Sequence, residues 1–140
     1  MTPPLLPEAL PTVLVVDDEV RSQDAMRRTL DEDFTIFTAS SADEARGLLE
    51  RQPVSVILCD QRMPGMTGVN FLKEVREQWP DIVRIVISGY TDSEDIIAGI
   101  NEAGIYQYIL KPWSPDHLLD SVRNAVEAQE LQQQTSRLDL

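Results

Sequence analysis

The sequence predicts an α/β fold in which five parallel strands form one doubly wound sheet, with helices on both faces. Three observations predict it: short apolar runs rich in β-branched residues, helical patterns between these runs, and short connections. The runs begin near residues 12, 33, 54, 82 and 106, which leaves room for only one crossover helix between consecutive strands. A chain of 140 residues therefore fits one (βα)5 domain.

The five runs are of two kinds. Four are apolar and β-branched: Thr12–Val16, Val54–Cys59, Ile82–Ile87 and Tyr106–Leu110. The run Phe34–Thr38 alternates apolar and polar side chains, as an edge or half-buried strand does. We expect the flavodoxin-like strand order 2-1-3-4-5, in which the first, third, fourth and fifth strands are neighbours.

Capping signals mark where three of the helices begin. Ser41 and Glu44 form a capping-box pair, and Thr91 and Glu94 form a second. The segment 114–116 combines an N-cap serine, a proline in the first turn and an aspartate near the positive end of the helix dipole. These signals place helices after the second, fourth and fifth strands.

Other residues indicate where helices end. Residues 71, 72, 75 and 79 are apolar at helical spacing, and Pro80 stops that helix. Gly104 supplies a C-cap for a helix expected over 92–103. These two helices are therefore short enough to be single crossover connections between parallel strands.

Composition excludes several classes of partner. The chain has 24 Asp and Glu against 12 Lys and Arg, a formal net charge of −12. Such a surface repels nucleic acid and anionic lipid, so we expect no direct DNA contact and no membrane contact. No apolar run approaches the roughly 18 residues of a membrane span. The single cysteine, Cys59, allows no internal disulfide and favours a cytoplasmic location.

The chain is expected to have three parts. Residues 1–11 form a tail with four prolines and no basic n-region, which is unlike a signal peptide. Residues 12–129 form the folded domain. Residues 130–140 are polar with sparse leucines and are expected to begin a linker helix toward an output domain outside this chain.

Polar side chains follow four of the expected strands. The strands end at Asp17-Asp18-Glu19, at Asp60, at Ser88-Gly89 and at Lys111-Pro112. Parallel strands bring their carboxyl ends to one edge of the sheet, where ligands bind. Neighbouring carboxylates repel unless a cation joins them, and a few carboxylates with a carbonyl and water suit Mg²⁺.

Asp60 is the candidate nucleophile of this edge. A carboxylate beside Mg²⁺, a lysine and a hydroxyl can become an acyl phosphate. Lys111 and the metal would neutralise the charge of a transferring phosphoryl group, and Ser88 would add a hydroxyl donor. The Met63-Pro64-Gly65 turn after Asp60 lets backbone atoms approach the metal.

Four motifs at these strand ends resemble the receiver domains of two-component response regulators. They are V-V-D-D-E at 15–19, C-D-Q-R-M-P-G-M-T-G at 59–68, I-S-G-Y at 87–90 and Y-I-L-K-P-W at 108–113. The similarity runs from about Thr12 to Gln129. It implies a protein that takes a phosphoryl group from a sensor histidine kinase and catalyses only its own Mg²⁺-dependent phosphorylation and dephosphorylation.

The resemblance also implies roles for individual residues. Asp60 is the phosphoacceptor. Asp17 and Asp18 are the acidic pair, with Asp18 the more direct Mg²⁺ ligand, and the backbone carbonyl of Arg62 is the third protein ligand. Lys111 contacts the phosphate and precedes Pro112 through a cis peptide bond.

The remaining implied roles concern the output. Ser88 and Tyr108 take the positions of the switch hydroxyl and the switch aromatic residue. The face formed by the helix 92–103, the fifth strand and the last helix is expected to pair two protomers. Gln61 departs from the resemblance, because an apolar residue is usual directly after the phosphoacceptor; a polar side chain there could alter the access of water to a phosphoryl group.

A finer resemblance is to the receivers of NtrC-class regulators of hydrogenase genes, which implies a transcriptional output. Similar motifs also occur in receivers attached to cyclic-dinucleotide phosphodiesterases, which remain an alternative. An aspartyl-phosphate phosphatase is a third, although such enzymes usually carry a second aspartate where this chain has Arg62. A flavodoxin-like electron carrier would need a phosphate-binding loop after the first strand, but Asp17-Asp18-Glu19 at that place would repel phosphate. An adaptor that is never phosphorylated would not need the set of acids, hydroxyl and lysine.

Overall fold

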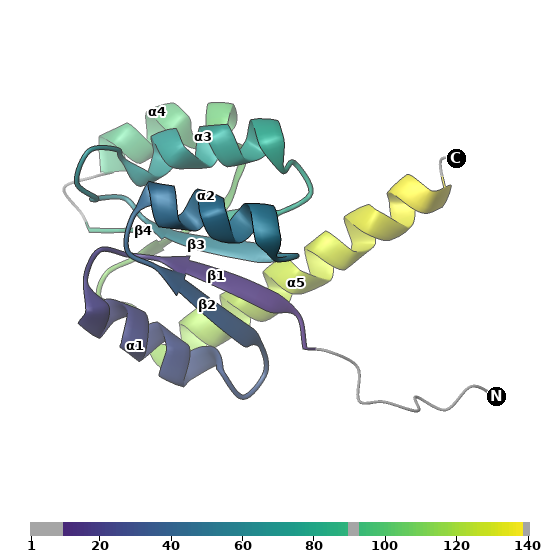
Figure 1. Ribbon diagram of the computed structural model, residues 1–140, viewed down its shortest axis with the longest axis horizontal. Coiled ribbons are helices and arrows are strands. Elements are labelled where there is room, and N and C mark those ends of the chain that lie inside the picture. Colours follow the sequence, from purple (N-terminus) through teal and green to yellow (C-terminus); the bar gives the residue numbers. More distant parts are fainter. Residues whose placement is uncertain (1–9, 90–92, 139–140) are drawn as a thin grey trace.

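The computed structural model describes residues 10–89 and 93–138, in which five strands alternate with five helices (Figure 1). The strands are β1 (Thr12–Val16), β2 (Thr35–Ala39), β3 (Val56–Asp60), β4 (Val83–Ser88) and β5 (Ile105–Leu110). The helices are α1 (Val20–Leu30), α2 (Ala42–Arg51), α3 (Gly68–Gln78), α4 (Ser93–Ala103) and α5 (Pro115–Leu138). All strand pairs are parallel and the order is β2-β1-β3-β4-β5, which confirms the predicted fold class and topology.

Two cores lie on opposite faces of the sheet. Alternate residues of β1 point to opposite faces, as in any strand: Val13 and Val15 pack toward α1 and α5, whereas Leu14 and Val16 pack toward α2, α3 and α4. Figure 1 shows the same division, with α2, α3 and α4 above the sheet and α1 and α5 below it. Both faces are therefore covered, which is why the central strands are apolar throughout.

The edge strands are less buried than the central ones. Every residue of β3 is buried, whereas the edge strand β2 is only partly covered, as its alternating pattern predicted. The opposite edge strand, β5, exposes Tyr106 and Tyr108 to 46% and 47%. The sheet therefore presents two half-exposed tyrosines beside α4 and α5.

The capping signals are largely realised. The Ser41 hydroxyl accepts from the backbone N–H of Glu44 at 3.1 Å, while the Glu44 carboxylate accepts from Ser40 N–H, one residue earlier than a standard capping box. The Ser114 hydroxyl caps α5 by accepting from the N–H of residue 117. Gly104 ends α4 with a φ of +61°, a conformation that favours glycine. The expected pair of Thr91 and Glu94 involves Thr91, which lies outside the described residues.

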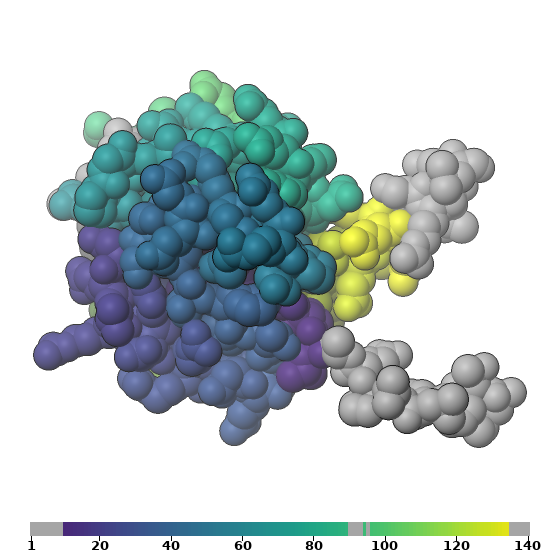
Figure 2. Space-filling model, in the orientation of Figure 1, coloured from purple at the N-terminus to yellow at the C-terminus, as the bar shows by residue number. Residues whose placement is uncertain are grey.

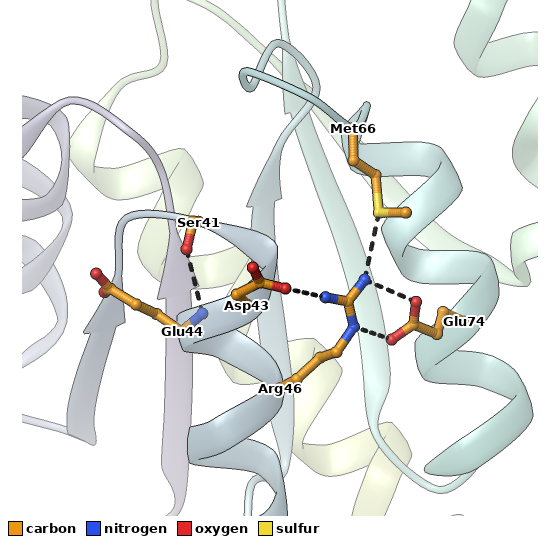
Figure 3. A network of polar contacts seen from close by, with 6 residues as sticks. All are labelled: Ser41, Asp43, Glu44, Arg46, Met66 and Glu74. Carbon is orange, nitrogen blue, oxygen red and sulfur yellow. Dashed lines mark hydrogen bonds and ion pairs between the residues drawn. The ribbon is translucent and has the colours of Figure 1, made fainter.

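A polar network joins α2 to α3 on one face of the sheet (Figure 3). The Arg46 guanidinium donates to both carboxylate oxygens of Glu74 on α3, and it also pairs with Asp43 one turn earlier on α2. The same guanidinium lies 5.5 Å from the centre of the Phe71 ring and 3.7 Å from the sulfur of Met66. Because Met66 belongs to the β3–α3 loop, Arg46 ties that loop to two helices.

The last helix is longer than the sheet needs. It runs without a break from Pro115 to Leu138, through the expected domain boundary at 129. In the space-filling view its yellow C-terminal part projects from the globular body, where Leu131 is 61% exposed (Figure 2). Within the described ranges, no helix combines the length and apolarity required to cross a membrane.

Candidate phosphoryl-acceptor and metal site

The strand order brings the four polar strand ends to one edge. Asp60 is the last residue of β3 and is in register with Ile87 of β4, so Ser88 lies one position beyond it on the neighbouring strand. Asp17 follows β1, whose Val16 is in register with Cys59. Lys111 follows β5, and its N–H donates to the carbonyl of Ser88 at 2.7 Å. The sheet therefore gathers the residues that the sequence only placed at separate strand ends.

Three carboxylates form the acidic part of the site. Asp17, Asp18 and Asp60 each present an oxygen within 4.8 Å of the others. Asp17 and Asp60 are buried, whereas Asp18 is exposed and open to solvent. Among residues 10–89 and 93–138, Asp17 Oδ2 has no hydrogen-bond partner, although it is buried. A buried, unpartnered carboxylate oxygen next to two further carboxylates fits a divalent cation that prefers oxygen ligands.

Burial disfavours the charge on Asp17. It raises the pKa of Asp17 from 3.8 to about 6, and the charge of Asp60 acts in the same direction. The hydrogen bond from Glu19 N–H to Asp17 Oδ1, 2.9 Å long, opposes this by stabilising the carboxylate. Burial likewise raises the pKa of the Cys59 thiol, which keeps this core cysteine protonated.

Lys111 supplies the positive charge of the site. Its Nζ lies 2.6 Å from Asp60 Oδ1. Burial alone would lower the pKa of Lys111, but the hydrogen bond and the charge of Asp60 outweigh burial and raise it. The lysine is therefore a fixed cation beside the candidate nucleophile, and the peptide bond between Lys111 and Pro112 is cis.

The other candidate residues surround this pair. Ser88 is 1% exposed, and its hydroxyl has no hydrogen-bond partner in the described part of the chain. It is the second unpartnered polar group at this edge, after Asp17 Oδ2. Arg62 is exposed in the β3–α3 loop, two residues beyond Asp60. Tyr108 lies on β5 in register with Val86, with nearly half of its side chain exposed, so it is not a packed core aromatic.

A groove adjoins the acidic cluster on the side of α1. It has a volume of about 440 Å³ and is lined by Asp17, Ser22, Met26, Lys111, Pro112 and Trp113. Trp113 is partly buried against the core shared by α1 and α5. An indole ring therefore lies close enough to the site to report on it.

Gln23 is a supporting residue that the sequence reasoning missed. Its side-chain amide is buried in α1 and donates to the carbonyl of Asp17 at 2.6 Å and to the hydroxyl of Ser40 at 2.9 Å. It thereby fixes the end of β1 against the loop after β2. The available signal was its spacing: Gln23 shares a helical face with Met26 and Leu30, where an apolar residue is normal.

Comparison with known proteins agrees with this geometry. The model of the response regulator receiver domain family matches residues 13–123, so the chain belongs to that family. It is 82% identical over 129 residues to the hydrogenase transcriptional regulatory protein HoxA of Cupriavidus necator, covering 92% of this chain and 27% of that protein. Its identity to HoxA of Bradyrhizobium diazoefficiens is 62% over 124 residues, covering 89% of this chain and 26% of that relative.

Solved structures show the same fold. The signal receiver domain of an HD domain-containing protein from Pseudomonas fluorescens has a TM-score of 0.86 at 29% identity, and the match covers 92% of this chain and 96% of that one. NtrX from Brucella abortus also has a TM-score of 0.86 at 30% identity, covering 94% of this chain but 30% of that one. Compared with the two HoxA relatives, the chain spans about a quarter of their length.

Proposed function

We propose that Asp60 accepts a phosphoryl group from a phosphohistidine of a partner sensor histidine kinase. The observation that carries this proposal is the pairing of the buried Asp60 carboxylate with Lys111 inside a group of three carboxylates. A carboxylate oxygen of Asp60 attacks phosphorus, the P–N bond of the phosphohistidine breaks, and its electron pair returns to the imidazole, which takes up a proton. The product is an acyl phosphate on Asp60.

Each neighbouring residue has a role in this transfer. Lys111 Nζ, already 2.6 Å from Asp60 Oδ1, can neutralise charge on the incoming phosphoryl oxygens. The Ser88 hydroxyl, buried and without a partner in the described chain, can donate to one of those oxygens. Lys111 is therefore already in place for the transfer, whereas Ser88 would move toward the phosphoryl group once it is bound.

We assign Mg²⁺ as the metal of the site. The ion would be held by Asp17, Asp18, Asp60 and the backbone carbonyl of Arg62. It would act as a Lewis acid that reduces the electrostatic repulsion between the carboxylates and the phosphoryl group. The buried Asp17 Oδ2, which has no hydrogen-bond partner among the described residues, supports this assignment. The raised pKa of Asp17 supports it too, because a nearby cation would favour the ionised carboxylate.

The experiment is phosphorylation by acetyl phosphate with Mg²⁺, followed by intact mass measurement. Wild type should gain one phosphoryl mass, and the gain should vanish in Asp60→Asn or in excess EDTA. Asp24→Asn, an exposed aspartate on α1, is the matched control and should label normally. Labelling of Asp60→Asn at the wild-type level would refute the assignment of the acceptor.

The output that we propose is control of hydrogenase gene transcription, carried out by a part of the protein outside this chain. It is supported by the printed names of the two HoxA relatives and their high identity. Control of a cyclic-dinucleotide phosphodiesterase is the second candidate, since one solved receiver of this fold belongs to an HD domain-containing protein. An aspartyl-phosphate phosphatase is disfavoured by Arg62, which stands where such enzymes carry an acid.

The receiver itself would act in the cytoplasm without touching DNA. Its net charge of −12 repels nucleic acid, and its one cysteine is buried and free. We place the transmitted signal on the face of α4, β5 and α5, where Ile97, Tyr106 and Tyr108 are exposed. Movement of Ser88 toward a phosphoryl group would let Tyr108 rotate inward and change how this face pairs two protomers.

A further inference from the structure

Gln61 makes three contacts that connect the end of β3 to two neighbouring elements. Its backbone N–H donates to the carbonyl of Ile87 on β4, and its backbone carbonyl accepts from Gly68 N–H, both at 2.9 Å. Its side-chain Oε1 accepts from Val69 N–H, also at 2.9 Å. The side chain is 2% exposed, so this bond is shielded from water.

These contacts close the base of the β3–α3 loop. The first N–H groups of a helix have no partner within it, and here Gln61 accepts from two of them in succession. The next one, of Asn70, donates to the hydroxyl of Thr67 at 3.2 Å. Gly68 allows the close approach, because a Cβ there would overlap the carbonyl of Asp60 and lie 3.0 Å from Gln61 Cα.

The side chain of Gln61 lies beside α3, where it accepts from Val69 N–H. It lines a cleft of about 300 Å³ between α3 and α4, together with Val69, Lys73 and Glu102. Its amide oxygen therefore supports the start of α3, next to the loop that follows Asp60. Arg62, whose carbonyl is the proposed third metal ligand, follows Gln61 directly in the chain.

We propose that Gln61 is a positioning residue of the metal site, which sets the place of the Arg62 carbonyl through its bond to Val69 N–H. The inference rests on the proposed function, because it requires that this carbonyl binds Mg²⁺. Without the side-chain bond, the buried N–H of Val69 loses its acceptor, and the base of the loop loses one of the contacts that hold it against α3. The carbonyl then samples positions in which it cannot complete the ligand set, so metal affinity falls.

The test compares Mg²⁺ affinity in matched variants, measured through the fluorescence of Trp113 beside the site. Gln61→Leu keeps the approximate volume but has no acceptor, and its Kd for Mg²⁺ should rise about tenfold, the lower end of what loss of an outer support costs. Gln61→Glu restores an acceptor where a negative charge suits the helix terminus, so it should bind at least as tightly as wild type.

Thr67→Ala is the matched control, because it removes the cap of the next amide of the same helix. Its Mg²⁺ affinity should stay within about twofold of wild type, although α3 loses an N-cap hydrogen bond. Amide hydrogen exchange at Val69 should accelerate in Gln61→Leu and not in Gln61→Glu. Should Gln61→Leu fail to fold, Gln61→Asn, too short to reach Val69, is expected to show the same affinity loss.

Two results would overturn the inference. One is wild-type Mg²⁺ affinity in Gln61→Leu despite faster exchange at Val69; the other is an equal loss of affinity in Gln61→Leu and Thr67→Ala, which would reduce Gln61 to a helix cap. Failure of the proposed function looks different: wild type itself would bind no Mg²⁺, or its binding would be unaffected by Asp18→Ala.

Discussion

Replacing Asp17 with asparagine should make the metal-free protein more stable at neutral pH. The Asp17 side chain is buried, and its pKa in the folded protein is about 6 instead of 3.8. Between these two values the folded state binds a proton that the unfolded chain has released. Stability therefore falls as pH rises from about 3.8 through 6, and the loss is complete above roughly pH 7.

The size of the effect follows from the displacement of the pKa. A difference of about two pH units, at 1.36 kcal/mol each, makes ionised Asp17 cost the folded state about 3 kcal/mol at pH 8. Asparagine has the same shape without the charge, and its carbonyl can still accept from Glu19 N–H. Because its amide group must also find a partner among the neighbours of Asp17, we expect a net gain of about 2 kcal/mol.

The assay is urea unfolding at pH 5 and pH 8 in EDTA, repeated with Mg²⁺. At pH 8 the free energy of unfolding should be higher for Asp17→Asn than for wild type. The difference should shrink at pH 5, where Asp17 of wild type is largely protonated. Mg²⁺ should stabilise wild type more than the variant. Asp24→Asn, on the exposed face of α1, serves as the control and should follow wild type. A variant no more stable than wild type in EDTA at pH 8 would refute the reasoning.

Two further predictions concern the helices and the output face. Arg46→Met should lower the free energy of unfolding, measured by urea titration, by about 1 kcal/mol, because the bidentate pair of Arg46 with Glu74 is partly shielded from solvent. Asp43→Asn removes only the exposed partner of Arg46 and should leave the free energy of unfolding almost unchanged. Tyr108→Ala should abolish any shift in sedimentation that phosphorylation of Asp60 causes, and Tyr108→Phe should retain it; an unchanged shift in Tyr108→Ala would contradict the proposed route.

The sequence predicts the architecture and the site edge because both depend on local patterns. The apolar runs and the short connections predict a doubly wound parallel sheet, and the polar residues at the strand ends mark Asp17, Asp60, Ser88 and Lys111 as candidates for one edge. The strand order then makes the four polar strand ends neighbours, since parallel strands end at a common edge whatever their side chains. That is why predictions on single residues were possible without any knowledge of contacts.

Contacts between distant residues could not be predicted in the same way. Arg46 and Glu74 are 28 positions apart, and nothing in either helix alone indicates that they pair. Gln61 drew notice only because it is polar beside Asp60, and its actual partner, Val69 N–H, depends on how closely Gly68 packs on the loop. The raised pKa of Asp17 likewise depends on burial, which is a property of the packed molecule.

Two arginines hold the C-terminal end of α4 in place. The carbonyls of the last helical turn have no partners within a helix, and here two arginines share them. Arg76 donates to the backbone carbonyls of Asn101 and Glu102. Arg84 donates to those of Ala103 and Gly104. Both cations also oppose the negative end of the helix dipole. The C-terminal end of α4 is thus fixed to α3 and β4, so a displacement of Ser88 would change the exposed face of α4 mainly toward its N-terminal end.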